Sequence, residues 1–108
     1  MFRRQFLAAL PGFALAPLAA RAASHAEAPI IRIEGFKFVP EVVEITAGHA
    51  VEWFNADRTA HTATATDKSF DTKRIRSGDS ATVVFREPGT YAYYCRFHRR
   101  MKGTVIVT

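Results

Sequence analysis

The stretch "TYAYYCRFHRRMKGTVIVT", residues 90–108, places two apolar segments on either side of a short basic one. Tyr91 alternates with Tyr93, and Val105 with Val107, at the period of a half-buried β-strand. The only cysteine of the chain, Cys95, ends the first of these predicted strands. If the chain turns back there, the seven residues 95–101 form a loop at one end of the domain.

The remainder of the chain also has the pattern of a β protein. Five further runs are rich in β-branched or aromatic residues: 30–38, 42–45, 50–55, 61–66 and 81–85. Turn-forming residues separate these runs, and no window has a helical period. Seven or eight short strands in so small a domain need two packed sheets to bury one face of each. We therefore predict an all-β sandwich. The aromatic residues expected to fill much of its core are Phe36, Phe38, Trp53, Phe54, Phe70, Phe85 and the tyrosines.

Residues 1–22 have a basic start, an apolar middle and small residues at the end, which is the layout of a cleaved signal peptide. Prolines and a glycine interrupt the apolar part, which is too short to span a membrane. Arg3 and Arg4 resemble a twin-arginine export signal, with an ordinary secretory signal as the alternative. We expect cleavage after Ala22, with Ala26 as a second choice, and export to the periplasm. Residues 23–108 are then one domain of 86 residues.

The charge of that domain excludes a general polyanion binder. The leader carries three of the 15 basic residues and none of the ten acidic ones, so the net charge falls from +5 to +2. No nucleic-acid-binding motif is present. The remaining basic character is local, because Arg96, Arg99, Arg100 and Lys102 lie close together in the sequence. We expect a monomer that binds no nucleic acid and does not insert in a membrane.

A single cysteine cannot form a disulfide within its own chain. Cys95 is therefore an intermolecular link, an inert buried thiol, a nucleophile or a metal ligand. His98 and Met101 follow it at spacings of three and three. A thiolate, an imidazole and a thioether on one loop suit a soft or borderline metal, and two histidines with one cysteine and a distant methionine form a blue-copper site.

Such a site needs a second histidine from another part of the chain. His25 lies beside the predicted cleavage point, and His49 lies in the turn "AGHA". His61 begins the predicted strand 61–66, where a position at the strand end favours contact with Cys95. His61 is the preferred candidate.

These motifs resemble those of the cupredoxins, and most closely the amicyanin and plastocyanin-like branch. The segments "GFKFVPEVVEITAGHAVEWFNAD" and "FDTKRIRSGDSATVVFREPGTYAYYC" match the two halves of that family, and the short ligand loop matches amicyanin. The resemblance implies a Greek-key β-sandwich with one copper ion held by His61, Cys95, His98 and Met101. It further implies an electron carrier rather than an enzyme. Its redox partners would be a periplasmic dehydrogenase as donor and a c-type cytochrome as acceptor.

The sequence departs from that family beside the ligands. Thr62 stands where the family commonly has Asn, and its hydroxyl offers a related hydrogen bond. Ala60 and Arg99 replace the two prolines of amicyanin, so the ligand loop is more basic. The basic residues of the loop either steer an acidic redox partner or form an ordinary solvated surface.

Four alternatives use some of the same residues. Copper delivery or storage would need an exchangeable site, and an oxidase or reductase would need further histidines. A thiol nucleophile at Cys95 with His98 lacks a visible third residue to orient the base and leaves Met101 unexplained. Zinc could take the place of copper without redox activity.

Overall fold

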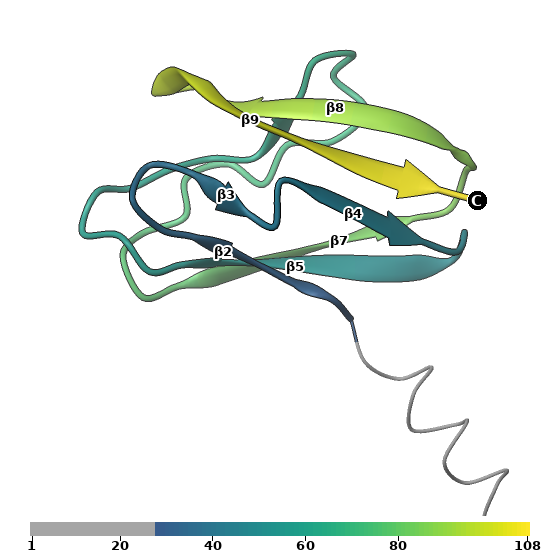
Figure 1. Ribbon diagram of the computed structural model, residues 1–108, viewed down its shortest axis with the longest axis horizontal. Coiled ribbons are helices and arrows are strands. Elements are labelled where there is room, and N and C mark those ends of the chain that lie inside the picture. Colours follow the sequence, from purple (N-terminus) through teal and green to yellow (C-terminus); the bar gives the residue numbers. More distant parts are fainter. Residues whose placement is uncertain (1–27) are drawn as a thin grey trace, which may run out of the picture.

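The computed structural model of this protein describes residues 28–108. It consists of two four-stranded sheets packed face to face (Figure 1). In spatial order, the first contains β3 (Phe38–Val39), β2 (Ile30–Ile33), β5 (His49–Asn55) and β7 (Ser80–Phe85). The second contains β4 (Val42–Ile45), β9 (His98–Val107), β8 (Gly89–Cys95) and β6 (Thr64–Ala65). The predicted β-sandwich is confirmed.

The described residues include no helix long and apolar enough to cross a membrane. The predicted signal peptide, 1–22, and both of its candidate cleavage points lie outside the described residues. The boundary between leader and domain therefore stays a prediction.

The chain crosses repeatedly between the two sheets, so most neighbouring strands within a sheet are not consecutive in the sequence. β2 pairs in parallel with β5, whereas β4 belongs to the opposite sheet and pairs in parallel with β9. Only the hairpin of β8 and β9 joins two consecutive strands of the second sheet directly. Its turn and the turn between β2 and β3 lie at the same end of the sandwich, away from the C-terminus (Figure 1). That end carries the candidate site.

The core follows the alternation of the strands. Along β9 the inward residues are Met101, Gly103, Val105 and Val107, each fully or almost fully buried. At the centre, the Trp53 ring lies 5.6 Å from that of Phe70 and 5.4 Å from that of Tyr93. Burial in this aromatic cluster raises the pKa of the Tyr93 phenol.

Phe36 is not part of the core. Residues 30–38 do not form one strand, because a two-residue turn at Gly35 and Phe36 divides them into β2 and β3. The turn directs Phe36 to the surface, where its side chain is 47% exposed. Phe54 is only partly buried. The prediction that both lie in the core was wrong, because aromatic character alone does not show which residues occupy a turn.

Two strand boundaries also differ from the prediction. Of residues 61–66 only Thr64 and Ala65 form a strand, although His61 makes an isolated bridge with Ile75. β9 already begins at His98, so the segment after Cys95 is a tight hairpin rather than an open loop. His98 is therefore held opposite Cys95 in the ladder, whereas residues 99–101, including Met101, lie in the register shift before pairing resumes between Lys102 and Tyr94.

Candidate metal centre

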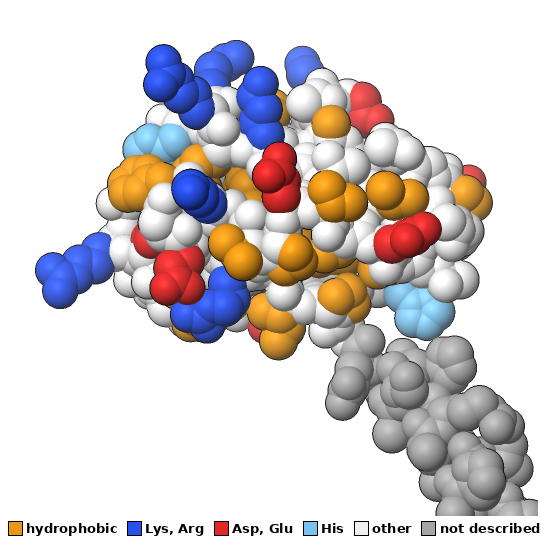
Figure 2. Space-filling model, in the orientation of Figure 1, with side chains coloured by type: hydrophobic (Ala, Val, Ile, Leu, Met, Phe, Trp, Pro, Cys, Tyr) orange, Lys and Arg blue, Asp and Glu red, His pale blue; other side chains and the backbone are white. Residues whose placement is uncertain are grey.

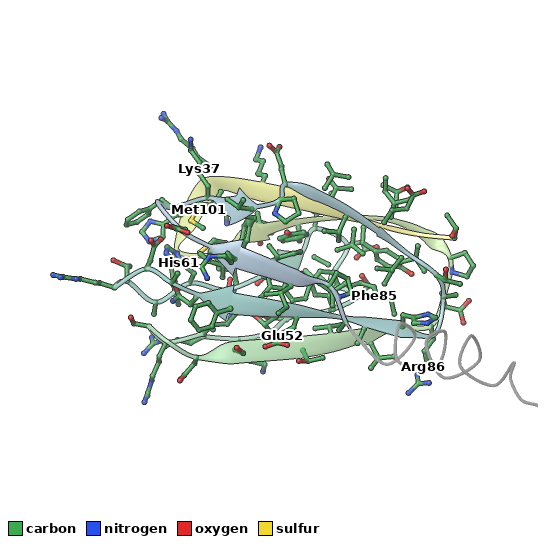
Figure 3. The ribbon with its side chains drawn as sticks, turned by 60° about the horizontal axis from the view of Figure 1, so that its bottom comes forward. Lys37, Glu52, His61, Phe85, Arg86 and Met101 are labelled. Carbon is green, nitrogen blue, oxygen red and sulfur yellow. The ribbon has the colours of Figure 1, made fainter. Side chains whose placement is uncertain are left out.

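The site lies where β8 ends and β9 begins. Cys95 is the last residue of β8, Arg96 and Phe97 form the turn, and His98 pairs with Cys95 across the ladder. A register shift at Tyr94 and Cys95 interrupts the regular pairing at this point. Figure 3 shows His61 and Met101 together at this end of the sandwich, with Phe85 and Arg86 at the other.

All four predicted ligands belong to this end of the molecule. His61 and Cys95 are fully buried, Met101 is 4% exposed, and His98 is partly exposed. The Nδ1 atom of His61 lies 3.7 Å from the Cys95 sulfur. The His98 ring meets the His61 ring edge to face, with centroids 5.2 Å apart.

His49, the rejected histidine, starts β5 opposite Phe85, at the far end of the sandwich (Figure 3). Its Nδ1 lies 3.0 Å from the backbone oxygen of Thr46. His25 lies outside the described residues. Of the second histidines considered, the structure therefore brings His61 to Cys95, and it holds His49 away.

Asp57 determines which nitrogen of His61 faces the sulfur. Its Oδ2 lies 2.9 Å from His61 Nε2, and an ionised carboxylate can only accept a hydrogen bond. Nε2 therefore donates, so in the neutral imidazole Nδ1 is the lone-pair nitrogen, and it faces Cys95. Partial burial opposes ionisation of Asp57, but the N–H groups of Phe36 and Gly35, together with His61, outweigh it and lower its pKa.

The loop that carries Asp57 and His61 is anchored by a buried amide. Asn55 is fully buried, and its Nδ2 donates to the backbone oxygens of Thr59 and Ile75, each at 2.9 Å. Its Oδ1 accepts the N–H of Asp57 at 2.9 Å. Both ends of the loop are thus fixed, which positions His61 before any ligand binds.

Thr62 connects the two ligand segments. Its N–H donates to the Cys95 sulfur at 3.4 Å, and its hydroxyl accepts the N–H of Arg96 at 2.9 Å. The same hydroxyl is hydrogen-bonded to Thr64, which donates to Asp71 at 3.1 Å. Asp71 lies 3.5 Å from the Arg96 guanidinium, which closes the network. A threonine can therefore make the connection for which the sequence pattern of the family favours asparagine.

Sequence reasoning missed Asp57, Asn55 and the Asp71–Arg96 pair. The only available signal was weak, because an aspartate four residues before His61 is not distinctive outside a helix. Asp71 and Arg96 are far apart in the chain and meet only through the fold. The network had to be found in three dimensions.

The donor set fits a soft or borderline metal. A cysteine sulfur, a methionine sulfur and two imidazoles are the ligands that copper accepts in both oxidation states. His98 Nε2 is buried with no hydrogen-bond partner among the described residues, as expected of a nitrogen available to a ligand. Among the described residues, no three His, Cys, Asp or Glu side chains are arranged so that they could hold a metal ion by themselves. His61 and Cys95 are in contact, and the His98 ring lies beside the His61 ring.

Comparison with known proteins identifies relatives over nearly the whole chain. Residues 6–107 match the family model of the cupredoxin-like domain. Amicyanin-alpha of Methylorubrum extorquens is 38% identical over 94% of this chain and 95% of its own length. Two similar solved structures are the amicyanin of Paracoccus versutus and the copper-containing nitrite reductase of Thermus scotoductus. The amicyanin is 30% identical, covers 77% of this chain and 83% of its own, and has a TM-score of 0.70. The reductase is 29% identical, with a TM-score of 0.71 over 76% of this chain but only 22% of its own.

Proposed function

This chain belongs to the cupredoxin family, and on that premise we propose that it is an exported electron carrier that works in the periplasm. Its amicyanin relatives are blue-copper electron-transfer proteins with a single type 1 copper ion. The likeness to nitrite reductase concerns about a fifth of that longer chain, so it supports a shared domain rather than a shared reaction. We therefore propose a carrier and not an enzyme.

The proposed ligands are His61, Cys95, His98 and Met101. The observation that carries this assignment is the burial of Cys95 against His61, whose Nδ1 faces the sulfur while its Nε2 donates to Asp57. Copper, when bound, would supply the one-electron couple, and its potential would depend on the ligands and on hydrogen bonds to the cysteine sulfur. Met101 would supply a weaker thioether ligand, and the Thr62 N–H provides such a hydrogen bond.

The surrounding residues suit a site that keeps its shape. Asp57 holds His61, Asn55 holds the loop, and Thr62 links both ligand segments, so each group has a fixed position in the folded protein. His98 is the most exposed of the four proposed ligands. We propose that electrons enter and leave through its imidazole, because partners can approach that ring most closely.

Redox cycling tests the function directly. The copper-loaded protein should be reduced and reoxidised repeatedly by one electron per chain, with its copper content unchanged after each cycle and after gel filtration. The fixed ligands favour both oxidation states without release of the ion. Loss of copper to a chelator on each reduction would instead favour the delivery function and contradict the carrier.

The basic surface supports a partner with an acidic docking face. Several Lys and Arg side chains lie at the upper left of the molecule in Figure 2, and the left is the end that carries the site. Arg100 and Lys102 are exposed, and no ion pair involves them among residues 28–108. With Phe36, Lys37 and one carboxylate, Glu41, they line a hollow beside Met101. Arg96 and Arg99 are less available, because Arg96 pairs with Asp71 and Arg99 lies over the Tyr94 ring.

The resemblance to amicyanin supports a dehydrogenase as donor and a c-type cytochrome as acceptor.

Replacing Arg100 and Lys102 together by Glu should lower the second-order rate constant of electron transfer with an acidic partner by about tenfold at low ionic strength. The difference should shrink as salt screens the charges. Arg86→Glu at the opposite end is the control, because Arg86 is also exposed but lies far from His61 (Figure 3). Stopped-flow rates that respond equally to both changes would reject local steering.

A further inference from the structure

The turn between β2 and β3 has an unusual residue at its second central position. Glu34 and Lys37 exchange both backbone hydrogen bonds, at 2.9 and 3.2 Å, which leaves Gly35 and Phe36 as a two-residue turn. Their φ angles are 63° and 61°. Turns of this kind need positive φ at both positions and favour Gly and Asn, whereas a bulky side chain is strained there. Phe36 therefore occupies a backbone conformation that its own side chain opposes.

Asp57 holds this strained turn and the histidine together. Its carboxylate accepts the N–H of Gly35 at 2.7 Å and that of Phe36 at 2.9 Å. The same carboxylate accepts the Nε2–H of His61 at 2.9 Å. The Asp57 side chain is only 13% exposed, and its contact with His61 is partly buried, whereas the two turn residues whose N–H groups it accepts lie at the surface.

The Phe36 ring is placed over both histidines. Its centroid lies 5.1 Å from that of His61 and 4.8 Å from that of His98, in edge-on contacts of 85° and 78°. About half of Phe36 faces solvent, whereas His61 beneath it is fully buried. Strained residues that the surrounding structure holds in place are often found at functional sites.

We propose that Asp57 fixes Phe36 as an apolar cover over His61 and His98, and that this cover keeps water and small anions away from the two imidazoles. The importance of the cover for electron transfer rests on the proposed function. Its ability to exclude solvent does not, because the same contacts exist in the copper-free protein.

The copper-free protein gives the first test. Proton NMR should measure the exchange rate of the His61 Nε2–H with water in the wild-type protein, Phe36→Gly and Lys68→Gly. Lys68 is the matched control, because it also has a positive φ, 68°, but lies in an exposed turn after β6. Glycine suits both backbone positions, so neither variant should lower the melting temperature by more than a few degrees. We expect exchange at least about tenfold faster in Phe36→Gly and unchanged in Lys68→Gly. Equal exchange in all three proteins would overturn the cover.

The role of Asp57 in holding the Phe36 turn is tested separately with the variant Asp57→Asn. An amide presents one oxygen rather than two, so at least one turn N–H loses its acceptor. Nuclear Overhauser contacts between the Phe36 and His98 rings should fall by at least half, while those between Trp53 and Tyr93 in the core stay unchanged. Contacts of full strength would show that Asp57 does not hold the ring.

Azide, a small anionic copper ligand, provides the test in the loaded protein. Azide should perturb the visible spectrum of copper-loaded Phe36→Gly at a concentration at least about tenfold below that needed for the wild type or Lys68→Gly. Equal sensitivity in the three proteins would contradict exclusion of anions. If none of them binds copper, the proposed function fails, yet the exchange experiment still decides whether Phe36 covers the histidines.

Discussion

Replacing Cys95 by Ser is expected to abolish the intense visible absorption of the copper-loaded protein. The absorption requires a thiolate ligand, and a hydroxyl at this fully buried position cannot supply one. Changes to residues that only support a metal ligand typically cost 10- to 100-fold in affinity, so loss of the ligand should cost at least about 100-fold. Copper titrations followed by absorption and equilibrium dialysis measure both effects.

Met101→Leu is the matched control for that experiment. Met101 is almost as buried as Cys95, and leucine has a similar volume, so the fold should tolerate the change. Because a weak thioether ligand would tune rather than create the site, the coloured form should persist with a shifted reduction potential. If Cys95→Ser stays coloured, or if both variants lose colour equally, the assigned roles of the two sulfurs are wrong.

Gly103→Ala should be the most destabilising single methyl addition in the second sheet. Gly103 on β9 pairs with Tyr93 on β8, and both are buried. A Cβ at Gly103 would overlap severely with Oη and Cζ of Tyr93 and would lie 2.9 Å from Cε1. The ring cannot move aside easily, because it also packs against Trp53 and Phe38. The free energy of unfolding should fall by at least about 2 kcal/mol.

The cause of that loss can be isolated with a double-mutant cycle. In a Tyr93→Leu background, which lacks the overlapping atoms, adding Gly103→Ala should cost less than about 1 kcal/mol. Lys102→Ala, at the adjacent exposed position, should change the free energy of unfolding by no more than about 0.5 kcal/mol. Urea unfolding of the copper-free proteins measures all of these values. A cost for Gly103→Ala that is unchanged by Tyr93→Leu would reject the proposed overlap.

This pair also connects stability with the site. Tyr93 and Cys95 face the core from the same side of β8, and Gly103 and Met101 do so on β9. The absence of a side chain at Gly103 leaves room for the Tyr93 ring, which neighbours Cys95 on the buried face of β8. Displacing that ring would therefore disturb the positions of Cys95 and Met101, two of the proposed ligands.

The sequence was sufficient for the fold class and for the candidate donors. Alternation along the strands reports which face is buried, and the spacing of Cys95, His98 and Met101 limits the chemistry that they can share. Contacts between segments that are far apart in the sequence could not be predicted from strand alternation or residue spacing. Nothing near Thr62 in the sequence shows that Asp71 and Arg96 will complete its network, because these residues meet only after the sheets pack.

Phe36 is a residue for which local sequence preference gives the wrong prediction. Local preference predicts a buried strand for an aromatic residue in an apolar run, and it disfavours positive φ. The structure places Phe36 in a turn because Asp57, about 20 residues away in sequence, accepts both turn N–H groups. Tertiary hydrogen bonds therefore override local preference at this position, beside the proposed ligands, where such exceptions are expected.

The most direct measurement of the central claim is a copper titration of the wild-type protein. Cu(II) added to the copper-free protein should produce an intense visible band that saturates at one ion per chain and bleaches reversibly with one electron. That result requires a thiolate and two imidazoles at a single site, as His61, Cys95 and His98 would provide. A protein that stays colourless at full copper occupancy would contradict the account.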